Sequence, residues 1–185
     1  MVRLEEYAYI LDYLPHGHPG SRKFKKEPIA YGVGDTEFKL LELIPKPNAS
    51  LIVGDRVYIG KEMDKRDAIL HVKRRVRYTE LTSAAQSELP YVIAEIVKNN
   101  EERFVKFFNE AIPVTTKFHM LELLPGLGKK TMWSILEERK KEPFKSFEDI
   151  KRRVPAIHHP EKLIIDRIMK ELTEPGQKYH LFVAK

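Results

Sequence analysis

The feature of this chain that most restricts its fold is a short segment that occurs twice, thirty residues apart. Residues 124–130 read Leu-Pro-Gly-Leu-Gly-Lys-Lys, and residues 154–160 read Val-Pro-Ala-Ile-His-His-Pro in the same register. Each copy is followed by a stretch whose apolar residues recur at helical spacing. The repeat therefore predicts one helix–turn–helix unit used twice, with both copies sharing a single core.

The turn of the first copy has the residues of a phosphate-binding turn. Gly126 and Gly128 allow the backbone to turn tightly and to approach a ligand closely, because they lack a Cβ. The helix expected from Lys129 or Lys130 onward directs free N–H groups and its positive dipole end toward the same place. Lys129 and Lys130 add charge, so a phosphate is the expected ligand.

The second copy departs from this pattern at the positions that matter for binding. Ala156 and His158 stand where the first copy has glycines, and Pro160 removes one N–H donor at the start of the next helix. We expect this turn to be mainly structural, with a face that a protein partner could contact. The helix before it, residues 147–153, is expected to be capped by Ser146.

The first eighty residues predict short strands. Aromatic and β-branched segments at 7–14, 29–33, 38–44, 53–60 and 68–78 are separated by Pro, Gly and charged residues. About five short strands without a long helix are typical of a small barrel. An OB-like barrel is expected, and an SH3-like barrel is the near alternative.

The periodicity changes at Thr82. Thr82 or Ser83 can cap a helix, and apolar residues recur at helical spacing from Glu88 to Ala111. The pair Asn99-Asn100 is expected to divide this segment into two helices. The fold class is therefore α+β, in three parts: an OB-like β-barrel (1–81), a helical bridge (82–115) and an all-α tandem hairpin domain (116–185).

Composition narrows the class of protein. The chain lacks cysteine, which excludes disulfides, thiolate metal sites and cysteine nucleophiles. It shows neither the apolar stretch of a signal peptide nor a run long enough to cross a membrane, so we expect a cytoplasmic protein. The net charge is +6, and residues 116–185 hold 15 Lys and Arg against 10 Asp and Glu. This surplus favours a polyanionic partner.

Two further basic segments are candidate nucleic-acid contacts. On an extended strand, Lys73, Arg75 and Arg77 share one face, and Tyr78 lies on the other with Arg74. Such a surface can hold a phosphate backbone and stack a base on tyrosine, although a solvated edge strand protected by charge is the alternative. The second segment is the basic loop 16–28, a possible arm or simply a loop without a dedicated partner, with Arg22, Lys23, Lys25 and Lys26 as candidate contacts.

The tryptophan is expected to be structural, and the histidine pairs are not expected to bind a metal. Trp133 is expected to pack in the core of the hairpin domain with Leu121, Leu124 and Ile135. The pairs His16/His18 and His158/His159 lack further ligands nearby, so we expect no metal site.

Residues 116–172 resemble the tandem helix-hairpin-helix domain of DNA repair, recombination and some RNA-associated proteins. In that family, hairpin amides bind a phosphate of either strand without reading sequence, often with a monovalent cation held by hairpin carbonyls. By position, the resemblance implies contacts from the amides of Gly126, Gly128 and Lys130 and the side chains of Lys129, Lys130 and Thr131. The whole turn, Leu127 included, is therefore the expected binding site.

The whole chain, barrel first and tandem hairpin second, also resembles an uncharacterised archaeal family usually described as nucleic-acid- or RNA-binding. This resemblance favours RNA, with ribosomal RNA as a candidate, over DNA. We therefore expect a non-catalytic nucleic-acid-binding protein that needs no cofactor beyond the monovalent cation at the hairpin.

Two other functions stay open. Helix-hairpin-helix DNA glycosylases carry a lysine near the position of Lys130 and an aspartate some twenty residues later, close to Asp149. The chain lacks the extra helical domain that forms a base pocket in those enzymes, which argues against catalysis. A DNA-repair enzyme or its accessory factor is therefore kept only as the first alternative. The second is a protein–protein docking role for the hairpins.

Overall fold

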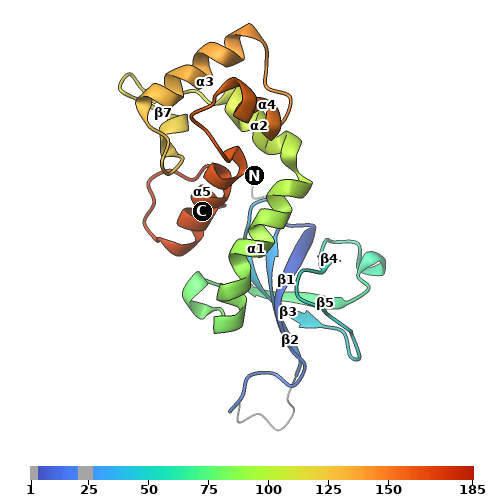
Figure 1. The fold of residues 1–185 in the computed structure, drawn as a ribbon. Helices are drawn as coiled ribbons and strands as arrows, with labels where there is room; N and C mark the ends of the chain where they lie inside the picture. Colours follow the sequence, from blue (N-terminus) through green and yellow to red (C-terminus); the bar gives the residue numbers. More distant parts are fainter. Residues whose placement is uncertain (1–3, 21–26) are drawn as a thin grey trace. The chain divides into compact units, whose positions relative to one another are not determined.

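The computed structural model describes residues 4–20 and 27–185. It confirms the α+β class: an N-terminal five-stranded antiparallel half-barrel is followed, within the described residues, by a five-helix C-terminal region (Figure 1). The chain forms two compact units. One runs to Val92 and takes in Glu171–Lys185, and the other is Ile93–Lys170. The limits of these units differ from the expected segments, because the C-terminal tail belongs with the barrel unit.

The sheet has the order β4-β1-β2-β3-β5, with every neighbouring pair antiparallel. Its edges β4 and β5 are not paired with each other, so the sheet is a half-barrel. The five expected strands are confirmed, although the fourth shrinks to three residues and the fifth ends early. The strands are β1 (Tyr7–Leu14), β2 (Ile29–Gly34), β3 (Leu40–Pro45), β4 (Arg56–Tyr58) and β5 (Ile69–Arg75).

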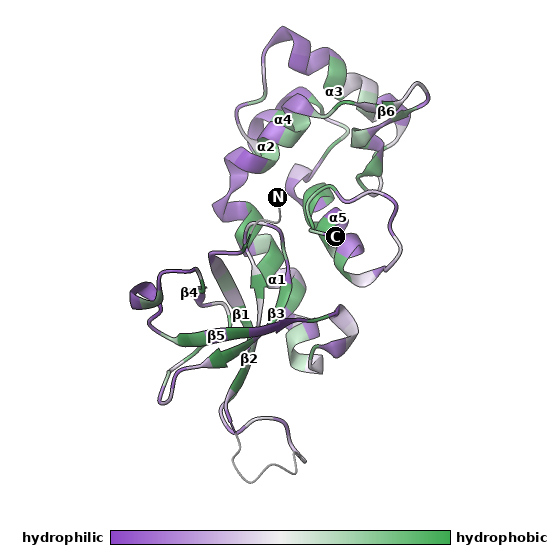
Figure 2. Cartoon of the chain, turned by 180° about the vertical axis from the view of Figure 1, so that it is seen from behind, coloured by the Kyte–Doolittle hydropathy of each residue, from purple (hydrophilic) through white to green (hydrophobic). Residues whose placement is uncertain are grey.

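One hydrophobic cluster of the barrel unit lies on one face of this sheet. Alternate residues of a strand point to the same face, so Ala8 and Ile10 of β1 and Leu41 and Leu43 of β3 are buried together. Figure 2 shows the hydrophobic residues concentrated along the strands. Burial of each large side chain contributes about 1.5–3 kcal/mol. The cluster also includes Ala30, Leu51, Ile59 and Ile69.

A buried carboxylate closes the turn between β2 and β3. Glu5 is 6% exposed and accepts hydrogen bonds from the backbone N–H groups of Thr36, Glu37 and Lys39 at 2.8–3.3 Å. A Cβ on Gly34 would lie 2.0 Å from the Glu5 Cδ, so any other residue here would displace the Glu5 carboxylate. Three N–H donors satisfy the buried charge.

The C-terminal tail is held in the same way. The Glu171 carboxylate is fully buried and accepts hydrogen bonds from the N–H groups of Leu181, Phe182 and Val183 at 3.0–3.2 Å. The Ala184 N–H donates to the Glu37 carbonyl at 3.1 Å. The tail is therefore part of the barrel unit, which the sequence did not indicate.

The helix boundaries expected after the barrel are confirmed. α1 spans Ser83–Asn99, and the Thr82 hydroxyl accepts from the Ala85 N–H at 3.1 Å, so Thr82 is its N-cap. The same hydroxyl donates to Asp12 of β1 at 2.6 Å. α2 spans Glu101–Glu110, so the break falls at Asn100 as expected.

The segment before the first hairpin turn differs from the expected apolar helix. It consists of β7 (Phe118–His119), paired with β6 (Pro113–Thr115), and a 3-10 helix at Met120–Leu123. The His119 Nδ1 accepts from the Leu121 N–H at 3.0 Å and closes this short turn. Pro125 donates no N–H, so helical hydrogen bonding ends before it.

The remaining helices follow the repeat. α3 spans Lys129–Lys141, α4 spans Phe147–Arg153 and α5 spans Pro160–Thr173. Ser146 caps α4 by accepting from the Asp149 N–H at 2.9 Å, as expected. The helical part of the fold therefore contains two helix-bounded turns, Leu124–Gly128 and Val154–His159.

Candidate nucleic-acid interface

The two turns share one hydrogen-bond pattern in the register of the repeat. The Leu127 N–H donates to the Leu124 carbonyl at 3.1 Å, and the Ile157 N–H donates to the Val154 carbonyl at 2.9 Å. Arg167 of α5 is 2% exposed and donates to the Leu123 carbonyl at 3.3 Å. This buried guanidinium joins the helix of the second copy to the segment before the first turn.

The backbone of the two turns differs at one position. Gly126 has φ +85°, in the left-handed region, whereas its counterpart Ala156 does not have a positive φ. Glycine adopts this conformation without the steric cost that a Cβ brings. The substitution of glycine by alanine in the second copy therefore goes with a different path of the turn.

Gly128 stands at the N-cap of α3 with extended backbone angles and no side-chain cap. A Cβ at Gly126 or Gly128 would meet no atom within 4 Å, so the space outside this turn is open. The first helical hydrogen bond runs from the Met132 N–H to the Gly128 carbonyl. The earlier N–H groups of α3 have no intrahelical acceptor, which leaves them available to an anion.

The predicted turn residues divide between anchors and exposed groups. Leu127 is 7% exposed, so its side chain anchors the turn. Lys129 is exposed and lies 3.7 Å from the Glu122 carboxylate. Lys130 is exposed, and no carboxylate of the described residues forms an ion pair with it. Thr131 lies half-buried one position further on.

The carbonyls of the turn are the groups that would hold the cation that the helix-hairpin-helix family implies. A carbonyl oxygen has two lone pairs, and the Leu124 carbonyl uses one for the Leu127 N–H. A monovalent cation held by such carbonyls would add positive charge beside a bound phosphate.

A hollow of about 350 Å³ separates the two turns. It places His158, His159 and Lys162, which were not among the predicted binding residues, next to the first turn. In the register of the repeat, residues 158–162 align with residues 128–132, and this alignment could have identified them from the sequence. The lining consists of Pro125, Gly126, Leu127, Thr131, Ala156, Ile157, His158, His159, Lys162, Leu163 and Asp166.

The basic strand does not present the face that simple alternation predicts. The pairing of β3 with β5 shifts register between Glu42 and Leu43, and Lys73 has no partner residue there. Both Lys73 and Arg74 reach the buried Glu42 carboxylate, at 3.5 and 2.7 Å. A bulge of this kind turns two consecutive side chains toward one side of the sheet, so Glu42 compensates part of the positive charge.

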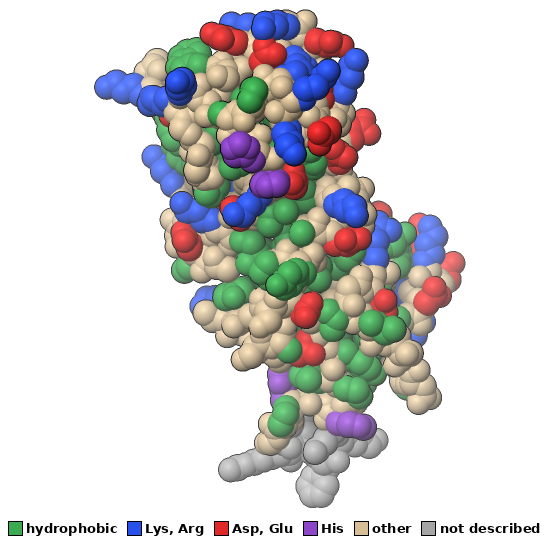
Figure 3. All heavy atoms as spheres, in the orientation of Figure 1, with side chains coloured by type: hydrophobic (Ala, Val, Ile, Leu, Met, Phe, Trp, Pro, Cys, Tyr) green, Lys and Arg blue, Asp and Glu red, His purple; other side chains and the backbone are tan. Residues whose placement is uncertain are grey.

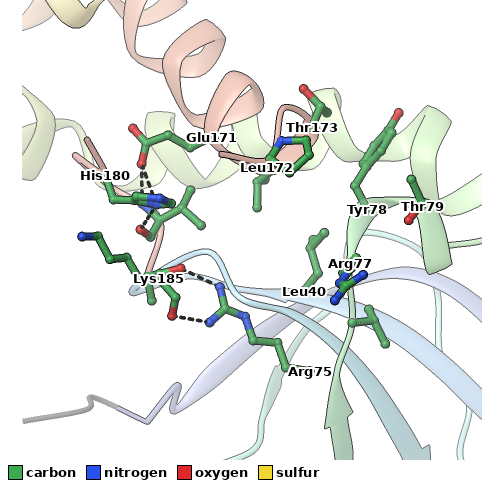
Figure 4. A pocket seen from close by; sticks show the side chains of 14 residues that line it. Leu40, Arg75, Arg77, Tyr78, Thr79, Glu171, Leu172, Thr173, His180 and Lys185 are labelled. Carbon is green, nitrogen blue, oxygen red and sulfur yellow. Dashed lines mark hydrogen bonds and ion pairs between the residues drawn. The ribbon is translucent and has the colours of Figure 1, made fainter. Parts of the chain in front are cut away.

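Arg75, Arg77 and Tyr78 lie along a pocket of about 460 Å³ in the barrel unit. Arg75 donates to the carbonyls of Ala184 and Lys185 at 2.6 and 2.9 Å, and Figure 4 shows its guanidinium turned toward Lys185. Arg77 and Tyr78 follow the end of β5, where Tyr78 begins a 3-10 helix. The expected face of Lys73, Arg75 and Arg77 is therefore divided among three environments.

Asp149, the residue that could have served in a glycosylase, has structural partners. It is 8% exposed, and hydrogen bonds from Arg152, from the Lys145 N–H and from Arg153 hold its pKa at about 2, below the usual 3.8. These contacts join α4 to the preceding loop.

Figure 3 shows Lys and Arg side chains gathered over α3 and α4, mixed with Asp and Glu.

Trp133 does not pack in the core as expected: its side chain is 59% exposed. The buried residues of α3 are Met132 and Ile135. With 3.6 residues per turn, Met132 and Ile135 lie on one face of the helix, and Trp133, next to Met132, points away from that face. The indole is therefore available on the surface.

The four predicted contacts of the basic loop have no described position. These residues, Arg22, Lys23, Lys25 and Lys26, lie outside the described residues. Within 4–20 and 27–185, no three His, Asp or Glu side chains gather to hold a metal ion. In the same ranges, no helix is both long and apolar enough to span a membrane.

Taken together, the fold and the hairpin site define a class of protein in which a five-stranded half-barrel is joined to a helical region with a duplicated hairpin. The particular family follows from comparison with known proteins. The chain belongs to a family described as a protein of unknown function, DUF655, whose pattern it matches over residues 4–184.

Two relatives are similar over nearly the whole chain. An uncharacterised protein of Methanocaldococcus jannaschii is 50% identical over 182 residues, which cover 98% of this chain and 81% of the relative. The crystal structure of Af1531 from Archaeoglobus fulgidus, of the same family, is 52% identical with a TM-score of 0.90, and the match covers 97% of this chain and 100% of that one. Both relatives come from archaea.

Proposed function

We propose that this protein binds a nucleic-acid backbone without catalysing a reaction, and that the turn Gly126–Thr131 holds a phosphate. The observation that carries the proposal is the start of α3. Its first N–H groups follow an N-cap glycine without a side-chain cap, in open space, beside two exposed lysines. Free amides, the helix dipole and local positive charge all favour a phosphate at this place.

RNA, with ribosomal RNA as a candidate, is the polymer that this proposal favours, as the resemblance seen in the sequence implies; DUF655 itself is described as of unknown function. A cytoplasmic location and a protein partner at the second turn belong to the same proposal. The contacts of Asp149 support a non-catalytic role, since a carboxylate paired with Arg152 and Arg153 is a poor general base or nucleophile.

The experiment that tests the proposal measures binding of an RNA and a DNA oligonucleotide at several salt concentrations. Gly128→Asp is the sharpest variant. An aspartate at the N-cap can accept hydrogen bonds from α3 and keeps the fold, but it places negative charge where the phosphate binds. We expect affinity to fall by at least about tenfold, and Lys129→Glu with Lys130→Glu to lower the salt slope by about 1 per lost contact.

Lys106→Glu on α2 is the matched control, because it changes the charge of an exposed lysine away from the turn. A folded Gly128→Asp variant that binds as tightly as wild type would overturn the assignment of the turn. Strand scission or base release by wild type, lost in Lys130→Ala, would overturn the non-catalytic role.

A further inference from the structure

A second surface in the helical unit has the properties of a ligand site. A groove of about 460 Å³ lies between α3 and the β6–β7 hairpin. Lys129, Trp133 and Leu136 of α3 line it at helical spacing, so they share one face of the helix. The exposed Trp133 indole offers a flat aromatic surface on that face.

His119 supplies an independent indication of a ligand. It lines the groove and is 6% exposed. Because its Nδ1 accepts the Leu121 N–H, the proton of the neutral ring is on Nε2. Burial and the nearby Arg139 lower the pKa of His119 against the opposing effect of Glu122, which keeps the ring neutral.

The Nε2 of His119 is buried and has no hydrogen-bond partner among the described residues. A buried N–H without an acceptor is costly, so native proteins rarely leave one unpaired. The chemistry of this position calls for an acceptor such as a carbonyl oxygen or a ring nitrogen.

The charge of the groove favours an anionic strand. Lys117, Lys129, Arg139 and Lys140 line it together with the two acids Glu122 and Glu137. Lys129 belongs to the hairpin turn as well as to the groove. Trp133 stands one helical turn beyond Lys129 on the same face, so a strand held at the turn can continue into the groove.

We propose that the groove binds an unpaired nucleotide of the strand whose phosphate is held at the hairpin. Its base stacks on Trp133 and accepts a hydrogen bond from the His119 Nε2, while Lys140 faces the next phosphate. Since Nε2 is covered in the unbound protein, the lining side chains shift as the base enters. This inference rests on the proposed function and adds that the target has unpaired bases, because a base within a duplex cannot offer its face.

Trp133 is the one tryptophan in the sequence, so its fluorescence reports on the groove directly. The test titrates the full chain with a single strand of about 12 nucleotides and with a blunt duplex of the same sequence. We expect the single strand to quench Trp133 fluorescence and to bind more tightly than the duplex. Equal affinity for the two, without quenching, would overturn the inference.

Variants separate stacking from packing. We expect Trp133→Ala to weaken single-strand binding about tenfold and Trp133→Tyr to restore most of it, with duplex binding unchanged. His119→Asn keeps an acceptor for the Leu121 N–H but lacks the Nε2 donor, and we expect about threefold weaker single-strand binding. Tyr91→Ala, at another exposed aromatic residue, is the control. Melting temperatures show that the variants are folded.

Gly128→Asp distinguishes the failure of this inference from that of the proposed function. If neither single strand nor duplex binds the wild type, both are wrong. If Gly128→Asp abolishes binding but folded Trp133→Ala binds the single strand like wild type, only the groove assignment is wrong.

Discussion

The Glu42 carboxylate accepts a hydrogen bond from the Arg74 guanidinium at 2.7 Å, and the two residues are 32 positions apart in the chain. Glu42 is buried, whereas Arg74 is half-exposed and also pairs with Glu80 at 3.0 Å. The contact holds Arg74 in place and compensates its charge. It decides how much positive potential the basic strand presents to a ligand.

We predict that Glu42→Gln strengthens nucleic-acid binding while it weakens the fold. The variant releases Lys73 and Arg74 from one buried carboxylate, so the slope of log affinity against log salt should steepen by about 1. The free energy of unfolding should fall by about 1 kcal/mol, since the exposed ends of the pairs are screened by solvent. Filter binding and urea denaturation measure the two effects.

Glu37→Gln is the matched control for this prediction. It removes the same charge from the barrel unit, where Glu37 pairs with Lys39 at 3.4 Å and with neither cation of the strand. An unchanged salt slope in Glu42→Gln would mean that β5 does not face the nucleic acid.

We predict that Asp149 contributes to stability in a defined pH range. Its pKa in the fold, about 2, lies below the usual 3.8. The contribution is therefore complete above about pH 4 and is lost as the pH falls from 4 toward 2, because the unfolded chain binds the proton first. Asp149→Asn should lower the melting temperature at pH 7 and remove this part of the acid sensitivity.

Glu148→Gln provides the comparison for Asp149, since it removes a neighbouring exposed carboxylate from the first turn of α4. In thermal melts between pH 2 and pH 7, Glu148→Gln should lower the melting temperature less than Asp149→Asn does. Identical curves for the two variants would contradict the assigned contacts.

We predict that the two glycines of the first turn respond differently to alanine. Gly126 has φ +85°, so Gly126→Ala should cost about 1–2 kcal/mol of unfolding free energy through backbone strain alone. Gly128 has extended angles and open space around it, so Gly128→Ala should cost about 0.5 kcal/mol or less. Chemical denaturation measures both.

The second turn gives the reverse test. Ala156 does not need a positive φ, so Ala156→Gly should destabilise the protein by about 0.5–1 kcal/mol, because glycine adds freedom to the unfolded chain. A stabilising Ala156→Gly would show that the second turn prefers the path of the first.

We predict that Glu171→Ala frees the C-terminal tail. Three backbone N–H groups, from Leu181 to Val183, would lose a buried carboxylate acceptor. The expected loss is about 2–3 kcal/mol, together with rapid hydrogen exchange at these amides and cleavage of the tail by proteases. Glu174→Ala, at an exposed residue after α5, should leave exchange unchanged. Slow exchange in a folded Glu171→Ala protein would contradict this role.

Local features could be predicted from the sequence. The register of the two turns, the caps Thr82 and Ser146, and the break at Asn100 all agree with the structure. Each depends on residues within about four positions of one another, where backbone geometry leaves few choices. The short 3-10 helix before the first turn was missed, because a histidine acting as its cap is an uncommon signal.

Features that depend on distant residues could not be predicted. The bulge at Lys73 follows from how β5 pairs with β3, and strand alternation alone cannot reveal it. The exposure of Trp133 follows from which face of α3 meets its neighbours. Helical spacing shows that Trp133 and Met132 lie on different faces, but not which of them is buried.

The sequence by itself determined the α+β order of strands and helices, the duplicated hairpin and the glycine turn with its two lysines. Only the tertiary structure decided which charged and aromatic groups are available to a ligand. It pairs Arg74 with Glu42, turns Arg75 to the C-terminal tail, and exposes Trp133 beside His119. The physical reason is that backbone preferences act over a few residues, whereas burial and ion pairing depend on side chains that only folding brings together.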